Sequence, residues 1–133
     1  MYKVSLFLLM AVFLSACKST PVKPNTAQPK TVEVEGKTLV FSGEYWVKKN
    51  SLIIFVNGDP VMRGSFPPYT PTRNLKADYE GLKLGVYCYF SSVLSNERGL
   101  FGVVAGAVQN ARSKSGDKCE VKIADEIVEH LYF

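Results

Sequence analysis

The sequence predicts a mainly β (α+β) domain, in which a small antiparallel sheet is curled as a barrel or a sandwich and one helix is inserted near residues 96–113. Two observations carry this prediction. Apolar and polar residues alternate along residues 82–90, and this period of two is typical of a strand with one buried face. Asn57-Gly58 follows the apolar run 51–56 and is the strongest short signal for a β-hairpin, because both residues tolerate positive φ.

The first half of the domain continues the strand pattern. The alternation over residues 31–35 predicts the first strand, and the same period runs on to residue 47 across Gly43. A glycine inside a strand indicates a bulge or close packing at that point. Pro60 lies just inside the strand that returns from the hairpin turn, which favours an edge position or a longer turn.

The second half contains a loop and further strands. Residues 66–72 hold three prolines and are predicted to be a loop. The strand at 82–90 is the clearest in the chain. The last strand, 126–133, is expected to turn Ile127, Leu131 and Phe133 inward.

The segment 95–114 allows two interpretations. Its apolar residues recur at helical spacing, and residues at both ends suit helix caps, but three glycines weaken a helix. As an exposed helix, it would dip into a membrane or dock on a partner through residues such as Leu100 and Phe101. The alternative is a helix or mobile loop packed across the sheet.

The N-terminus carries a recognisable export signal. An apolar run of 11 residues, 4–14, is too short to span a bilayer and has the size of a signal-peptide core. It ends in Leu14-Ser15-Ala16-Cys17, which resembles the lipobox of bacterial lipoproteins. The resemblance implies that residues 1–16 are a removed signal peptide and that Cys17 carries acyl chains such as palmitate. An ordinary secretory signal cleaved nearby is the alternative.

The same resemblance implies a location and a domain organisation. Lys18, in place of the aspartate that retains lipoproteins in the inner membrane, resembles the default for the outer membrane, so we expect the chain on its periplasmic face. Residues 17–30 contain three prolines and are expected to form a lipid-anchored tether. Residues 31–133 are expected to form a single periplasmic domain.

Export also bears on the remaining cysteines. With Cys17 assigned to lipid, Cys88 and Cys119 are left, and a pair in an oxidising compartment is most simply a disulfide. Each lies on the apolar face of its own predicted strand, as a buried disulfide requires. A Cα separation of roughly 4.4–6.8 Å is usual for such a bridge.

Charge and composition exclude some functions. The formal net charge is +4, and removing Lys3 with the signal leaves 4 − 1 = +3. This mild basic bias suits an anionic neighbour such as lipopolysaccharide or peptidoglycan, whereas no basic stripe indicates nucleic acid. His130 is the only histidine, so a multi-histidine metal site is excluded, and no motif indicates a cofactor or a catalytic group.

Aromatic residues are therefore the remaining candidates for recognition, because there are more of them than a core of this size must hold. The candidate binding residues are Tyr87, Tyr89, Trp46, Tyr69, Leu100 and Phe101. Tyr87 and Tyr89 lie on the polar face of their strand, where they could stack on sugars or a protein, or pack under the inserted helix. We expect a non-catalytic outer-membrane lipoprotein that binds or scaffolds an envelope partner. The alternative is a lipid-anchored inhibitor or exclusion factor that blocks an incoming protein such as a lysozyme, although a basic domain suits a basic enzyme poorly.

Overall fold

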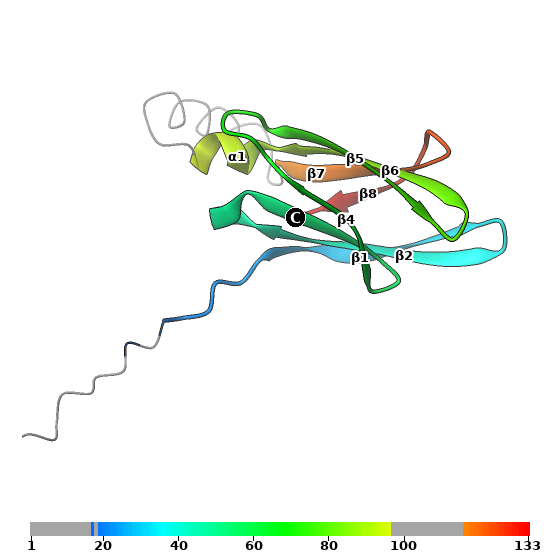
Figure 1. Ribbon diagram of the computed structural model, residues 1–133, viewed down its shortest axis with the longest axis horizontal. Coiled ribbons are helices and arrows are strands. Elements are labelled where there is room, and N and C mark those ends of the chain that lie inside the picture. The colour runs from blue at the N-terminus through cyan, green and yellow to red at the C-terminus, as the bar shows by residue number, and fades with distance from the viewer. Residues whose placement is uncertain (1–16, 18, 97–115) are drawn as a thin grey trace, which may run out of the picture.

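The computed structural model describes residues 17, 19–96 and 116–133, and it is mainly β (Figure 1). Two antiparallel sheets of four strands each make up the domain. The first sheet contains β1 (Asn25–Val34), β2 (Lys37–Trp46), β3 (Ser51–Val56) and β4 (Asp59–Ser65). The second contains β5 (Thr72–Tyr79), β6 (Leu82–Phe90), β7 (Asp117–Ile123) and β8 (Glu126–Tyr132). A 3-10 turn, η1 (Val47–Lys49), follows β2, and a short helix, α1 (Ser91–Asn96), follows β6.

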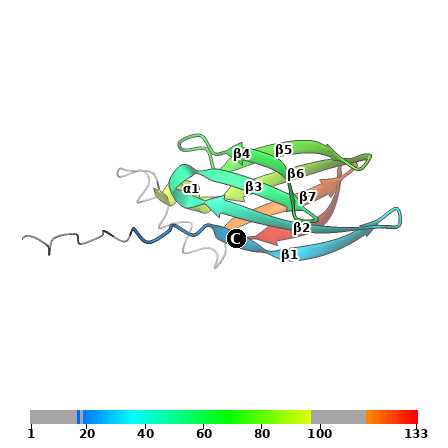
Figure 2. The ribbon, with the colours of Figure 1, turned by 60° about the horizontal axis from the view of Figure 1, so that its bottom comes forward.

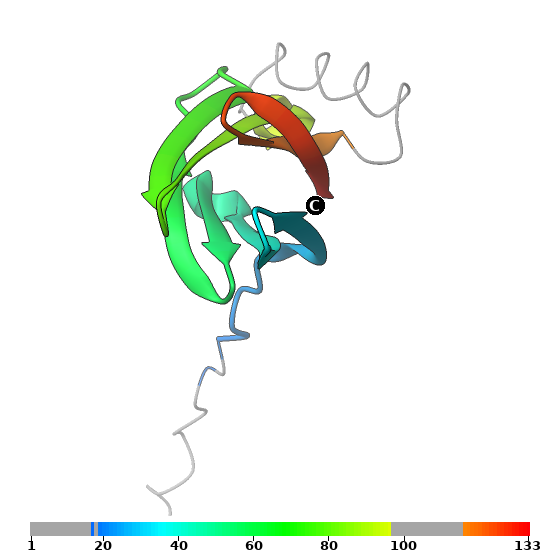
Figure 3. The same ribbon diagram turned by 90° about the vertical axis from the view of Figure 1, so that its right-hand side faces the viewer.

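The strands form a meander in which each strand is antiparallel to the next within its sheet. The two sheets face each other, with β4 beside β5 and β1 beside β8 (Figures 2 and 3). Hydrogen bonds do not close them into a barrel, so of the two predicted arrangements the sandwich fits. Consequently the turns β1–β2, β3–β4, β5–β6 and β7–β8 gather at one end, while η1, α1 and the start of β1 gather at the other.

The core lies between the inner faces of the two sheets. The alternation predicted for β6 is confirmed, since every second side chain from Leu82 to Phe90 is buried. Phe90 packs edge-on against Tyr45, with ring centroids 4.6 Å apart, and stacks on Phe66 at 4.8 Å. Such pairs stabilise a core beyond the area that they bury. These rings join the two sheets at the end near α1.

The Asn57-Gly58 hairpin is confirmed. Both residues have positive φ, 52° and 85°. The Asn57 side chain accepts a hydrogen bond from the backbone N–H of Val40 at 2.8 Å, and its own backbone N–H donates to the Val40 carbonyl at 2.9 Å. Asparagine therefore both permits the turn and ties it to β2.

Both strand-associated prolines lie in edge strands. Pro60 lies in β4, at a register shift opposite Phe55, in agreement with the predicted edge position. Pro29 lies in β1, at the shift between Ala27 and Lys30. Proline removes a backbone donor, and an edge strand at a bulge tolerates that loss.

The first strand begins earlier than the sequence pattern indicates. β1 starts at Asn25 rather than near Thr31, so residues 25–30 of the expected tether belong to the sheet. The bulge at Pro29 interrupts the alternation that would have revealed them. β5 was likewise not predicted, because it follows directly on the proline-rich loop.

The inward orientation predicted for Ile127 is wrong. Leu131 is buried as expected, but Ile127 is 48% exposed. A register shift in the β7–β8 pairing inserts Val128 as an extra residue, and Val128 packs against the core instead. The extra residue reverses the alternation along the strand, so Ile127 before it and Leu131 after it lie on opposite faces although both have odd numbers.

Gly43 is a point of close packing. A Cβ atom placed there would lie 2.5 Å from Cζ of Phe133 and 3.2 Å from Cδ1 of Ile54. The Phe133 ring also contacts Phe90, with centroids 4.9 Å apart. The missing side chain at residue 43 thus makes room for a ring that closes the core beside β8.

The inserted helix predicted for 96–113 lies outside the described residues apart from its first position. The part that is described, α1, is held by Asp117. One Asp117 carboxylate oxygen, Oδ1, accepts hydrogen bonds from the Ser92 backbone N–H at 3.0 Å and from the Ser91 hydroxyl at 3.4 Å. A carboxylate in this position satisfies an otherwise unpaired donor of the first helical turn.

Candidate functional site

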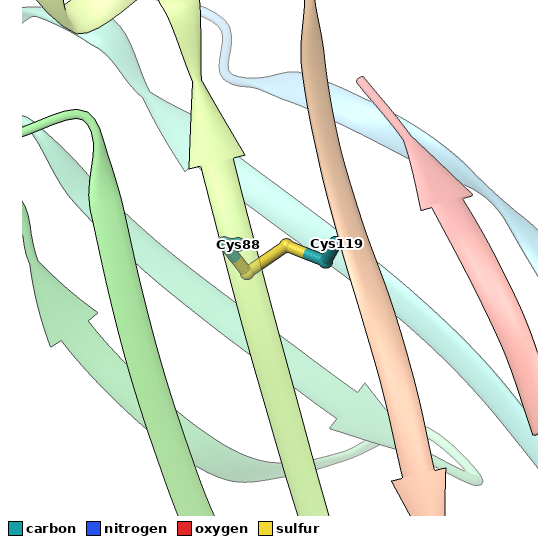
Figure 4. The surroundings of a disulfide bond; sticks show 2 residues. All are labelled: Cys88 and Cys119. Atoms are coloured by element: carbon teal, nitrogen blue, oxygen red, sulfur yellow. A yellow bond between two sulfur atoms is a disulfide. The ribbon is translucent and has the colours of Figure 1, made fainter. Parts of the chain in front are cut away.

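The disulfide between Cys88 and Cys119 fixes the centre of the β5–β8 sheet (Figure 4). The predicted bridge is confirmed, and both cysteines are fully buried. Their Cα atoms are 4.0 Å apart, slightly closer than the expected range. Because the two residues are direct partners in the β6–β7 pairing, the bridge holds the register of the residues on the opposite, outer face.

The outer face of this sheet carries two columns of rings on either side of a column of charged side chains. Tyr89 pairs with Lys118, which pairs with Tyr132. In the next row, Tyr87 pairs with Glu120, which pairs with His130. We call these six residues the ring face. Adjacent strands are about 4.8 Å apart, so the two ring columns are roughly 10 Å apart.

Several of these side chains are open to solvent. Tyr87 is 40% exposed and Tyr132 is 50% exposed, whereas Tyr89 and His130 are partly buried. His130 and Tyr132 stack nearly parallel, with an interplanar angle of 19° and centroids 6.4 Å apart. The ring face thus combines flat apolar surfaces with an ammonium and a carboxylate between them, which suits partners that present both apolar and hydrogen-bonding groups.

The β5 edge extends this face with polar groups. Thr72 is paired with Tyr89, and Asn74 is paired with Tyr87. Farther from α1, Lys76 and Lys122 flank Gly85, where the outer face has no side chain. A hollow of about 410 Å³ lies beside Gly85, and Lys76, Asp78, Lys83 and Asp125 contribute to its lining.

The remaining predicted binding residues do not join the ring face. Trp46 ends β2, and Tyr69 lies in the proline-rich loop, both at the end of the sandwich where β1 begins. Tyr69 is 49% exposed. Leu100 and Phe101 lie outside the described residues. Cys17, the expected lipid attachment site, is exposed and is not part of a disulfide.

Sequence reasoning missed the β8 half of the ring face. His130 was considered only as a metal ligand, and Tyr132 was not among the candidate binding residues. Both residues have even numbers in one strand, so their shared face could be read from alternation. Their proximity to Tyr87 and Tyr89 depends on the β7–β8 register, which a bulge sets.

Two further observations concern metal binding and membrane spanning in the part of the chain that the structure describes. Among the described residues, no group of three or more His, Cys, Asp or Glu side chains is placed to hold a metal ion. Within the same residues, none of the helices is both long and apolar enough to cross a membrane.

Comparisons with known proteins found no matching family model, no matching curated protein and no matching solved structure.

Proposed function

We propose that this chain is a non-catalytic lipoprotein of the outer membrane that binds an envelope partner through the ring face. The anchor is Cys17, on the resemblance of residues 14–17 to a lipobox. The observation that carries the binding role is the pair of ring columns with Lys118 and Glu120 between them.

This arrangement favours recognition over simple structure. Tyr87 is 40% exposed and Tyr132 is 50% exposed. A ring whose only role is packing would be covered by neighbouring side chains, so this exposure favours contact with a partner. Large exposed aromatic side chains on a rigid sheet supply contact area at low entropic cost. The two candidate partners are a glycan of the envelope, such as peptidoglycan or lipopolysaccharide, and an envelope protein.

The test compares substitutions of side chains with similar exposure. Replacing Tyr87 and Tyr132 by Ser removes two rings from the ring face, whereas Ile127→Ser removes an apolar side chain that is 48% exposed and belongs to neither proposed surface. At about 0.5–1.5 kcal/mol per aromatic contact, the double variant should lose roughly 5- to 150-fold in affinity.

Binding is measured by co-sedimentation with purified peptidoglycan and with lipopolysaccharide. A photocrosslinker at position 87 in cells reports a protein partner. Retained binding of the Tyr87/Tyr132 variant, together with a crosslink from position 87 that Tyr132→Ser leaves unchanged, would remove the ring face as the binding surface. Mass spectrometry that finds a free thiol at Cys17 would remove the anchor.

A second candidate function is inhibition of an incoming basic enzyme, and the distribution of carboxylate side chains favours it. The four turns far from α1 carry six exposed carboxylates, namely Glu35, Asp59, Asp78, Glu80, Asp125 and Glu126. We call this the acidic end. The basic residues beside them are Lys37, Lys83 and Lys76, which lines a hollow together with Asp78 and Asp125. The overall charge is basic, but this end is locally acidic and could meet a cationic partner.

That candidate has its own assay. Residues 17–133 are added to peptidoglycan digested by lysozyme, and inhibition is measured at low and high salt. Glu80→Gln with Glu126→Gln should weaken any inhibition, while Glu44→Gln with Glu120→Gln, which removes two carboxylates outside the acidic end, is the matched control. Salt should weaken the effect, because exposed charges are screened. Absence of inhibition by the unchanged chain would exclude this role for lysozyme.

A further inference from the structure

We propose that the end of the sandwich from which β1 starts is a membrane-contact surface that rests on anionic phospholipid. The surface consists of Val22, Trp46, Lys48, Lys49 and Tyr69, and we call it the lipid end. This inference rests on the proposed anchor at Cys17 for its place in the cell, but the chemistry of the surface can be tested without the anchor.

The position of the lipid end follows from the topology. Asn25 pairs with Tyr45, so the start of β1 lies beside the end of β2. Trp46 and η1 follow at once. The proline-rich loop lies next to them, because the Phe66 backbone N–H donates to the Asn50 carbonyl at 2.8 Å. Figure 1 shows η1, α1 and the incoming chain at this same end.

The tether brings this end close to the bilayer. Because β1 begins at Asn25, only eight residue steps separate it from Cys17. At up to about 3.6 Å per residue, these steps span less than roughly 30 Å when fully extended. A domain held this closely keeps the same end near the lipids.

The side chains at this end are those that favour a membrane interface. Tyr69 is 49% exposed and Val22 is 47% exposed. Val22, Trp46, Lys48 and Lys49 line an open recess of about 300 Å³, and the Lys49 ammonium lies 5.7 Å from the centre of the Trp46 ring. Tryptophan and tyrosine gather at the lipid headgroup level, and lysine stems lie along apolar surface while their ammonium groups reach phosphates.

The charge distribution gives an independent reason. Among the described loops and turns at the lipid end, the basic residues are Lys23, Lys48 and Lys49, and no Asp or Glu is present apart from the buried Asp117 that starts β7. The acidic end lies at the opposite pole of the sandwich. An anionic bilayer attracts the first end and repels the second, so both charges favour one orientation.

Trp46 allows a direct measurement, because it is the only tryptophan in the sequence. The lipidated protein is reconstituted in vesicles of phosphatidylethanolamine and phosphatidylglycerol that contain brominated phospholipid, which quenches nearby tryptophan. We expect strong quenching of Trp46. If the protein is anchored and Trp46 is not quenched, the lipid end is overturned while the anchor stands.

The second arm omits the anchor. All eight described strands lie between Asn25 and Tyr132, so residues 17–133 with Cys17→Ser contain the described fold. This protein should bind vesicles that contain phosphatidylglycerol and not vesicles of phosphatidylcholine alone. Lys48→Gln with Lys49→Gln should weaken binding by about 30-fold, at roughly a tenfold loss per 1.4 kcal/mol and about 1 kcal/mol for each lysine.

Matched variants separate this surface from the ring face. Lys76→Gln with Lys122→Gln removes the same charge from the outer face of the β5–β8 sheet and should leave vesicle binding unchanged. Equal losses in the two double variants would show attraction to net charge alone and would overturn the lipid end. If Cys17 proves unmodified but brominated anionic vesicles still quench the fluorescence of Trp46 in the unanchored protein, the lipid end is supported and the proposed anchor is refuted.

Discussion

The contact between Gly43 and Phe133 allows a prediction whose sign changes with the background. Gly43→Ala would place its new methyl group 2.5 Å and 2.8 Å from two atoms of the Phe133 ring. Forcing extra volume into a packed core costs about 1–3 kcal/mol. Removing a glycine from a strand interior returns about 0.5–1 kcal/mol. The substitution should therefore lower the free energy of unfolding by up to about 2.5 kcal/mol.

In a chain that also carries Phe133→Ala, the obstruction is gone. The remaining contact, 3.2 Å to Cδ1 of Ile54, is with the end of a flexible side chain. Gly43→Ala should then be neutral or should raise the free energy of unfolding by about 0.5–1 kcal/mol. The coupling between the two substitutions is thus about 1–3 kcal/mol, well above the additivity error of about 0.5 kcal/mol.

Urea denaturation of residues 17–133, with the disulfide intact, measures all four members of the cycle. The slope m must stay constant for the midpoints to report stability. Gly85→Ala is the control, because its Cβ would meet nothing closer than 3.8 Å, and it should stabilise the fold. If Gly43→Ala changes stability equally in both backgrounds, the packing argument is refuted.

Three further predictions concern the scaffold. Replacing Cys88 and Cys119 by Ala opens a link across 31 residues and should lower the unfolding free energy by about 3–4 kcal/mol, measured against the unreduced parent; a loss below 1 kcal/mol would contradict it. Asn57→Ala should cost about 1–2 kcal/mol, because Val40 loses a hydrogen-bond acceptor and the φ of 52° becomes strained, whereas Asn57→Asp should cost less. Desolvation is the largest cause that raises the pKa of Tyr79. A hydrogen bond to Asn57 lowers this pKa, and the hydrogen bond to Asp59 raises it. The stability that this group confers is present below the unfolded pKa of about 10 and is lost as pH rises through the folded pKa, so Tyr79→Phe should flatten the alkaline fall in melting temperature, and an unchanged slope would exclude Tyr79 as its source.

Features with a short range in sequence could be predicted. The faces of β6 follow from simple alternation, and the Asn57-Gly58 turn follows from two residues that tolerate positive φ. The disulfide could be inferred because each cysteine shares an apolar face with its strand neighbours. The strand faces and the turn depend on residues within one or two positions of each other, and the disulfide followed from the same local alternation around each of its two distant cysteines.

Features that depend on a bulge or on cross-strand register could not be predicted. One extra residue at Val128 turned Ile127 outward. The bulge at Pro29 interrupts the alternation of β1, so residues 25–30 were not recognised as part of the strand. The ring face shows the same limit, because Tyr87 could be placed on an outer face but not beside His130. Register is a property of strand pairs, and alternation within one strand does not determine it.

The surfaces that carry the two candidate functions lie at different distances from the membrane on which the lipid end is proposed to rest. This difference allows the two functions to be tested separately. The row of Tyr89 and Tyr132 lies toward the lipid end, whereas the acidic end begins about 24 Å away along β6, at roughly 3.4 Å per residue from Tyr89 to Leu82. A partner held in the membrane would reach the ring face at a fixed height, so a flexible Gly-Ser insertion after Thr20 should weaken its binding in cells. Inhibition of a soluble enzyme at the acidic end should tolerate the same insertion, because that end already faces away from the lipids. If the insertion leaves crosslinking at position 87 unchanged, the ring face does not serve a partner at a fixed height.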